Sequence, residues 1–208
     1  MIVSHAHRTC FFAVPRTASK AISKAMIEHL DGEEIKPMHL SYAEFMKAAN
    51  RSVRNYFTFA TVRNPMDSVV SAYFKKKSDH NGRFSRGTFK SGRPIAPRAM
   101  AEYRFIVEND ADFATYFAEF HRGEYQVPRH QETLAKVDHV LRYETLTEDY
   151  NQLCNQRGWP AHNIPVFNRT EGKEKDFLSY YTPAIRGQAK AYFGRIFTEW
   201  GYSFPANW

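Results

Sequence analysis

The stretch FFAVPRTASKAISKAM (Phe11–Met26) joins three patterns that together indicate an α/β fold. Apolar and aromatic residues over Thr9–Val14 predict a buried strand that ends before Pro15. Apolar residues then recur at helical spacing over Ser19–Leu30, which predicts a helix. A strand, a short loop and a helix start often form a phosphate site, because N–H groups at the helix start point at the anion. The glycine-rich Gly-Lys-Ser/Thr signature of such loops is absent, so other residues must decide what this loop binds.

Two more strands are expected later in the chain, at YFTFATV (Tyr56–Val62) and at Val137–Arg142. The first of them is rich in aromatic and β-branched residues and leads into Asn64-Pro65, a helix cap followed by a proline suited to the first helical position. Strands that alternate with helices predict an α/β protein with a central, mostly parallel sheet flanked by helices. Ligands on such sheets bind beyond the carboxyl ends of the strands.

Caps and breakers predict the remaining elements. Two Ser/Thr-x-x-Glu patterns, Ser41 with Glu44 and Thr145 with Glu148, predict capping boxes that open helices, and Gly158 is expected to close the second helix. The other expected elements are a short strand over 34–36, a helix from 65 to 77, helices over 99–107 and 112–121, and a last helix over 182–200.

Composition favours one folded domain with an anionic ligand. With 208 residues and 43% hydrophobic content, the chain can bury one core, so a single domain over 1–208 is expected. The net charge of +7 favours a nucleotide, a nucleic acid, an acidic glycan or an anionic lipid, and does not choose among them. Residues 78–98 are rich in Gly, Ser, Arg and Lys and predict a basic flexible loop, which is either a glycan-binding segment or a solvated flap.

Metal, disulfide and membrane signals are missing from the sequence. Cys10 and Cys154 form no disulfide framework or metal spacing, and Cys10 is expected to be buried. The nine His residues form no metal motif, so no metal site is expected. No apolar run reaches transmembrane length and the start MIVSHAHR is not a signal peptide, so we expect a cytoplasmic protein with no integral membrane segment.

Three groups of residues are candidates for chemistry. In the Pro15–Ala21 loop, Arg16 and Lys20 add positive charge, and the alternative is an ordinary turn with exposed cations. Arg63 with Ser71 suits a second phosphate, and the alternative is a surface arginine with a solvent-facing serine. His39 is a candidate base, although a lone His is more often structural.

These motifs resemble the PAPS-dependent sulfotransferases, where PAPS is 3′-phosphoadenosine 5′-phosphosulfate. Pro15-Arg16-Thr17-Ala18-Ser19 resembles their 5′-phosphosulfate loop, Pro-Lys-Thr-Gly/Ala-Ser/Thr. Val62-Arg63-Asn64-Pro65 followed by Ser71-Ala72-Tyr73-Phe74 resembles their 3′-phosphate motif, Arg-Asp-Pro followed by Ser-x-Tyr. The segment HLSYAEF ahead of RNP is most similar to the uronyl 2-O-sulfotransferases of heparan and dermatan sulfate, which are carbohydrate sulfotransferases. Gln131, VDHVLRYETL, NRTEGK and WGYSF extend the resemblance, in order, over most of the chain.

The resemblance implies a P-loop-like fold and sulfuryl transfer from PAPS to an acceptor hydroxyl, on a glycan or a small molecule. It implies that His39 takes the acceptor proton while Arg16 and Lys20 stabilise the leaving group, and that no metal is required. The nucleotide contacts that it implies are Arg16, Thr17, Ala18, Ser19, Lys20 and Ala21 for the 5′-phosphosulfate, Arg63 and Ser71 for the 3′-phosphate, and Arg169, Thr170 and Lys173 in a closing loop.

Three positions depart from the family pattern. Arg16 stands where the family usually has lysine; an arginine stabilises charge but is a poor proton donor, because it stays protonated. Asn64 stands where the family has aspartate, which leaves a capping side chain. Ser68 stands where the family often carries another arginine.

Two other functions are compatible with a basic α/β chain. A nucleotide kinase-like phosphotransferase needs a glycine-rich loop and an aspartate for Mg²⁺, and neither stands out. A non-catalytic basic module for glycans or nucleic acid is supported by charge and aromatic content, but no nucleic-acid motif is present, so no nucleic-acid partner is expected. The oligomeric state is left open.

Overall fold

The computed structural model describes residues 1–160, 162, 164 and 170–208, which fall into two compact units. The first unit comprises Met1–Asn64 and Val127–Asn168, and the second comprises Pro65–Gln126 and Arg169–Trp208. No helix of the described chain combines the length and the apolar character needed to cross a bilayer.

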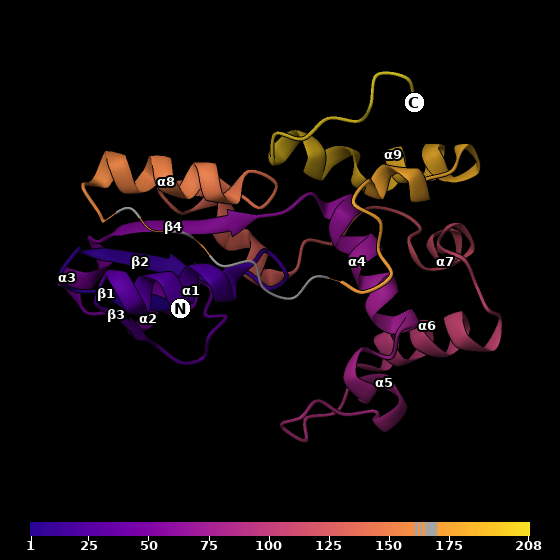
Figure 1. The fold of residues 1–208 in the computed structure, drawn as a ribbon, viewed down its shortest axis with the longest axis horizontal. Coiled ribbons are helices and arrows are strands. Elements are labelled where there is room, and N and C mark those ends of the chain that lie inside the picture. The colour runs from indigo at the N-terminus through magenta and orange to yellow at the C-terminus, as the bar shows by residue number, and fades with distance from the viewer. Residues whose placement is uncertain (161, 163, 165–169) are drawn as a thin grey trace. The chain divides into compact units, whose positions relative to one another are not determined.

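The first unit is built on a sheet of five strands in the order β3-β1-β2-β4-β5 (Figure 1). The strands are β1 Ile2–Ser4, β2 Thr9–Phe12, β3 Gly32–Glu34, β4 Phe57–Val62 and β5 His139–Arg142. β2, β4 and β5 are parallel neighbours, whereas β1 is antiparallel to both β2 and β3. Four strands therefore run in one direction and β1 runs in the other, which confirms the parallel centre and makes the sheet mixed at one edge.

One face of the sheet is covered by α1 (Ser19–His29) and α8 (Leu146–Arg157). Phe11 and Phe59 lie opposite each other on β2 and β4, with ring centroids 5.0 Å apart, and both are fully buried. They join apolar side chains of α1 and α8, including Ile22 and Leu153, in one core. The helix expected at 19–30 is confirmed as α1. Its apolar stripe is the face that packs on the strands.

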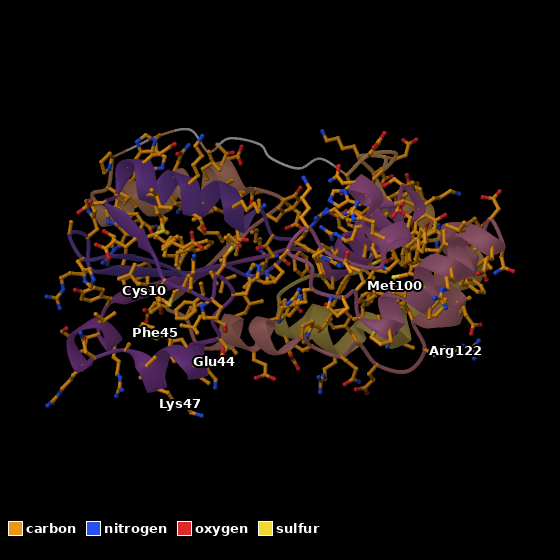
Figure 2. The ribbon with its side chains drawn as sticks, turned by 90° about the horizontal axis from the view of Figure 1, so that it is seen from below. Cys10, Glu44, Phe45, Lys47, Met100 and Arg122 are labelled. Atoms are coloured by element: carbon orange, nitrogen blue, oxygen red, sulfur yellow. The ribbon has the colours of Figure 1, made fainter. Side chains whose placement is uncertain are left out.

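The other face carries α2 (Tyr42–Ala48), α3 (Arg51–Arg54) and the 3₁₀ helix η2 (Arg129–Ala135). Phe45 packs edge-on against Phe12 of β2, with ring centroids 5.3 Å apart. Figure 2 shows Phe45 on the sheet side of α2 and Lys47 on the side away from it. Both parts of the predicted capping box of Ser41 and Glu44 are present.

The other predicted capping box is wrong. The Thr145 side chain makes no capping hydrogen bond, and its backbone lies at φ −123°, ψ 29°, outside the extended region that a capping side chain needs. The helix it precedes is nevertheless present and ends, as predicted, at Gly158, which has φ 67°. The short strand expected at 34–36 lies at Gly32–Glu34, and the sequence prediction missed β1.

Cys10 is confirmed as a buried thiol. It lies on β2 (Figure 2) with 0% exposure, and both Cys10 and Cys154 are free of disulfides. Burial raises the pKa of the Cys10 thiol to about 12. The residue therefore behaves as a small apolar core side chain.

The second unit is helical, as far as the chain is described. Its elements are α4 Pro65–Lys77, η1 His80–Gly82, α5 Arg83–Arg86, α6 Pro97–Glu108, α7 Phe113–Phe120, η3 Phe177–Tyr180 and α9 Pro183–Glu199 (Figure 1). Its core is aromatic: Phe117 and Phe193 are fully buried beside Tyr181, whose hydroxyl donates to the Met66 carbonyl at 3.1 Å. Residues 78–98, expected as a loop, contain η1, α5 and one isolated bridge between Thr88 and Pro94.

Candidate active site

The loop between β2 and α1 holds two non-glycine residues in the left-handed backbone region. Arg16 has φ 70°, and Ala18, the N-cap of α1, has φ 59°. Each such residue costs about 1–3 kcal/mol, and strain of this kind gathers at ligand sites. In the described chain no side chain caps the start of α1, and its first turn has no acidic residue. The helix start is therefore suited to an anion.

Thr17 anchors this loop to the interior of the first unit. Its side chain is 2% exposed, and its hydroxyl donates to the Val14 carbonyl at 2.8 Å. The same hydroxyl forms a short hydrogen bond with the hydroxyl of Thr61 on β4. The loop after β2 is thereby fixed to the neighbouring parallel strand. Sequence reasoning gave Thr17 a ligand role, and in the structure its hydroxyl also bonds to the protein.

The other predicted loop residues divide by exposure. The Arg16 and Lys20 side chains are exposed, so both cations lie at the surface of the loop. Ser19 is 6% exposed and Ala21 is 1% exposed, so both pack into the start of α1. These two residues can offer an anion little beyond their backbone N–H groups and the Ser19 hydroxyl.

Arg63 connects the loop after β4 to the loop after β2. Its side chain is 9% exposed, and its Nη1 donates to the Arg16 carbonyl at 3.2 Å. The guanidinium also stacks over the Tyr143 ring, with Cζ 4.3 Å from the ring centroid. A guanidinium held on a ring and a carbonyl loses little further freedom when it binds an oxyanion.

Sequence reasoning missed two residues after β5 that support this arrangement. Tyr143 supplies the ring beneath Arg63, and Glu144 Oε1 accepts a hydrogen bond from the Asn64 backbone N–H at 2.7 Å. The parallel pairing of β4 with β5 brings the two loops together. A signal existed in Tyr143 and Glu144, the polar residues that directly follow the strand expected at Val137–Arg142.

His39 lies in the same unit as the loop and points one ring nitrogen at it. Its Nδ1 lies 2.6 Å from the carbonyl oxygen of Ala13, two residues before Pro15. A carbonyl only accepts, so Nδ1 carries a proton, and in the neutral ring Nε2 keeps the lone pair. The His39 side chain is exposed. The hydrogen bond therefore fixes the ring at the end of β2, and Nε2 is the nitrogen left to accept a proton.

The remaining predicted residues belong to the second unit. Ser71 is buried on α4 with 1% exposure. Lys173 forms an ion pair with Asp67 of α4, at 2.5 Å between Nζ and Oδ1, and both side chains are mostly buried. Thr170 is partly buried, and Arg169 lies outside the described residues. The Lys173 ammonium is thus already balanced by a carboxylate.

Among the described residues, no three His, Cys, Asp or Glu side chains are grouped so that they could hold a metal ion. The side chains of the candidate site are cationic and hydrogen-bonding. Arginine, lysine and helix N–H groups bind an oxyanion, and one imidazole nitrogen is free to accept a proton.

Comparison with known proteins gives a match to a family model. Residues 1–200 match the model of a protein family described as the Sulfotransferase family. Neither a curated protein nor a solved structure matches the chain. The matched range includes the β2–α1 loop, His39 and Arg63. Because the match extends over almost the whole length of 208 residues, the chain belongs to the Sulfotransferase family.

Proposed function

We propose that this protein transfers the sulfuryl group of PAPS to a hydroxyl of a carbohydrate acceptor. The hydrogen bond from His39 Nδ1 to the Ala13 carbonyl supports this proposal most directly. In the neutral ring it leaves Nε2 as the acceptor nitrogen, on a side chain fixed to the end of β2, where the strained, cationic loop begins. A sulfuryl transferase needs a base close to its oxyanion site. The family membership supplies the reaction class, and the PAPS donor is part of the proposal.

The proposed step is a displacement at sulfur. His39 Nε2 accepts the hydroxyl proton while the acceptor oxygen bonds to sulfur and the bond from sulfur to the phosphate oxygen breaks. Arg16, Lys20 and the N–H groups of the loop stabilise the charge that develops on the departing phosphate. Arg16 acts by charge alone, because a guanidinium does not release its proton at neutral pH. A proton for the leaving group, where one is needed, comes from Lys20.

The 3′-phosphate is assigned to Arg63. Stacking on Tyr143 holds the guanidinium plane, and a planar fork of N–H donors matches a phosphate better than a lysine does. The resemblance adds Thr17, Ala18, Ser19 and Ala21 as contacts in the loop. It also adds Ser71, Thr170, Lys173 and Arg169, and these assignments stay predictions.

Two finer features are proposed from the resemblance alone: the acceptor is a glycan of the uronyl type, and the strand-loop-helix unit is of the P-loop-like sulfotransferase kind. A cytoplasmic location is proposed separately, from the sequence expectation given above. The basic residues of 78–98 offer the acceptor a positive surface, which suits an acidic glycan.

Nucleotide binding tests the donor, and transfer tests the reaction. We expect 3′,5′-ADP to raise the melting temperature much more than ATP with Mg²⁺ does, since only the former carries the 3′-phosphate. We then expect labelled sulfate to pass from PAPS to at least one member of a panel of glycans, phenols and lipids, and not in the His39→Ala variant. Equal or greater stabilisation by ATP with Mg²⁺ would favour the kinase-like alternative and contradict the proposal.

A further inference from the structure

A cavity of about 530 Å³ opens in the first unit at the end of the sheet where β2, β4 and β5 begin. Arg16 and Arg63 follow the other ends of β2 and β4. The walls of the cavity come from the residues just before β2, the first residues of β4, and Asp138 just before β5. These are the amino ends of parallel strands, whereas the candidate active site lies at their carboxyl ends. The cavity is therefore separate from the site described above.

Three arginines line the cavity, and the protein holds each guanidinium in place. Arg8 lies over the Tyr56 ring, with Cζ 5.5 Å from the centroid, and Arg157 lies over the Phe57 ring at 4.3 Å. Arg54 donates from Nε to the Ala49 carbonyl at 2.8 Å. A guanidinium that lies over an aromatic ring is attracted to the ring face without using its N–H groups in hydrogen bonds there.

The charge of these arginines is not balanced by acids. None of the three forms an ion pair in the part of the chain that is described. Asp138 is the one acid among the lining residues there, and its Oδ2 accepts hydrogen bonds from both the N–H and the hydroxyl of Thr58, each at 2.8 Å. Three arginines and one carboxylate therefore line the cavity, and the carboxylate is already hydrogen-bonded to Thr58.

The backbone of Arg8 adds an independent observation. Arg8 closes the β1–β2 turn, where its N–H donates to the His5 carbonyl at 3.3 Å, and its φ is 49°. In this left-handed region glycine is unstrained and an arginine is strained. The position thus carries a cationic side chain at a conformational cost, and a glycine there would remove the charge without straining the fold.

We propose that this cavity is a second anion site, which binds an oligoanion with phosphate or sulfate ester groups. Guanidinium forks match the paired oxygens of such esters, and several together suit a ligand with more than one charge. The volume fits a molecule the size of a nucleotide or a disaccharide. Two sources share this chemistry, a nucleotide and a sulfated sugar. The site does not depend on the proposed transfer reaction.

The test uses inorganic pyrophosphate and a trisulfated disaccharide as probes, titrated calorimetrically in the presence of saturating 3′,5′-ADP. We expect binding that Arg8→Gly and Arg157→Gln each weaken at least tenfold. We also expect Arg8→Gly not to lower the melting temperature below that of the parent protein, because glycine relieves the strain at φ 49°, and this excludes unfolding as the cause. Arg51→Ala removes an exposed arginine of α3 that does not line the cavity, and should leave the affinity unchanged.

The outcomes decide both the site and the source of the ligand. Tighter binding of the disaccharide supports a site for sulfated sugars, and tighter binding of pyrophosphate supports one for nucleotides. The proposal is overturned if neither probe binds at millimolar concentration, or if Arg8→Gly and Arg157→Gln bind like the parent. It is also overturned if Arg63→Ala alone abolishes probe binding, because the probe would then occupy the candidate active site.

Discussion

Arg63 donates a hydrogen bond from Nη1 to the backbone carbonyl of Arg16, across 3.2 Å. One bond thus links the end of β4 to the left-handed residue of the loop after β2. The Thr17–Thr61 pair links the same two segments through their side chains. The two cationic loops are therefore organised before any ligand arrives, and the entropy lost on binding is correspondingly small.

Removing the Arg63 fork should weaken nucleotide binding. We expect Arg63→Ala to reduce the affinity for 3′,5′-ADP by about 10–100-fold, the value of one or two charge-assisted hydrogen bonds of about 1.5–3 kcal/mol. Arg63→Lys should recover only part of this, because an ammonium cannot stack on Tyr143 and bind two oxygens at once. Calorimetric titration gives both affinities, and full affinity in Arg63→Ala would contradict the 3′-phosphate assignment.

Replacing His39 should affect turnover and not nucleotide affinity. We expect His39→Gln to lower sulfate transfer about 10²–10⁴-fold, since its amide can still donate to Ala13 but cannot take a proton. The affinity for 3′,5′-ADP should stay within threefold of the parent. Added imidazole should partly restore transfer in His39→Ala. If His39→Gln keeps the parent turnover, another group is the base.

The left-handed backbone of Ala18 predicts an unusual stability effect. We expect Ala18→Gly to raise the free energy of unfolding by about 1 kcal/mol, because glycine adopts φ 59° without strain. At another position, Gly158 has φ 67° and open space where a Cβ would be added. We expect Gly158→Ala to lower the free energy of unfolding by about 1 kcal/mol. Urea unfolding measures both, and a loss of stability in Ala18→Gly would show that the loop is not strained.

Acid should destabilise the second unit. Burial lowers the pKa of His121 to about 4 against the pull of Glu102, so between pH 6.5 and about 4 the unfolded chain binds a proton that the folded chain refuses. Above pH 6.5 this titration does not lower the free energy of unfolding. Between pH 6.5 and about 4 the free energy of unfolding falls by about 3 kcal/mol. For Glu102, burial opposes ionisation, but the Lys76 charge and hydrogen bonds from Lys76 and Arg98 lower the pKa overall. The free energy of unfolding should therefore fall further once the pH drops below the usual pKa of a glutamate.

The melting temperature measured from pH 7.5 to pH 4 checks this expectation. His121→Phe keeps an aromatic ring against Phe117, where the two rings are parallel with centroids 4.9 Å apart, and removes the titration. Its curve should be flatter between pH 6.5 and 4.5 than that of the parent. An equal slope in the two proteins would show that His121 does not contribute.

The sequence predicted the parts of the fold and site that local patterns determine. The β2–α1 loop, the β4 strand with Arg63 behind it, and His39 before a capped helix each follow from a short stretch. β1 was missed because three residues carry too little periodicity to stand out. Tyr143 acquires its role only once β5 pairs with β4, since nothing near it in the sequence names Arg63 as its partner.

The cavity at the amino ends of the parallel strands could not be predicted for the same reason. Arg8, Arg54 and Arg157 are far apart in the chain, and only the register of three strands brings them to one place. The Thr145 prediction failed differently, because a matching residue pattern did not fix the backbone dihedral angles at the turn after β5.

The burial of both native thiols has a practical consequence for labelling. Maleimide dyes react with thiolates, and burial raises the pKa of Cys10 and of Cys154. The folded protein should therefore take up no dye, so a single Lys47→Cys change on the outer side of α2 would place one fluorophore on each molecule (Figure 2). Dye in excess of one per molecule would measure the fraction of molecules in which Cys10 or Cys154 has become exposed.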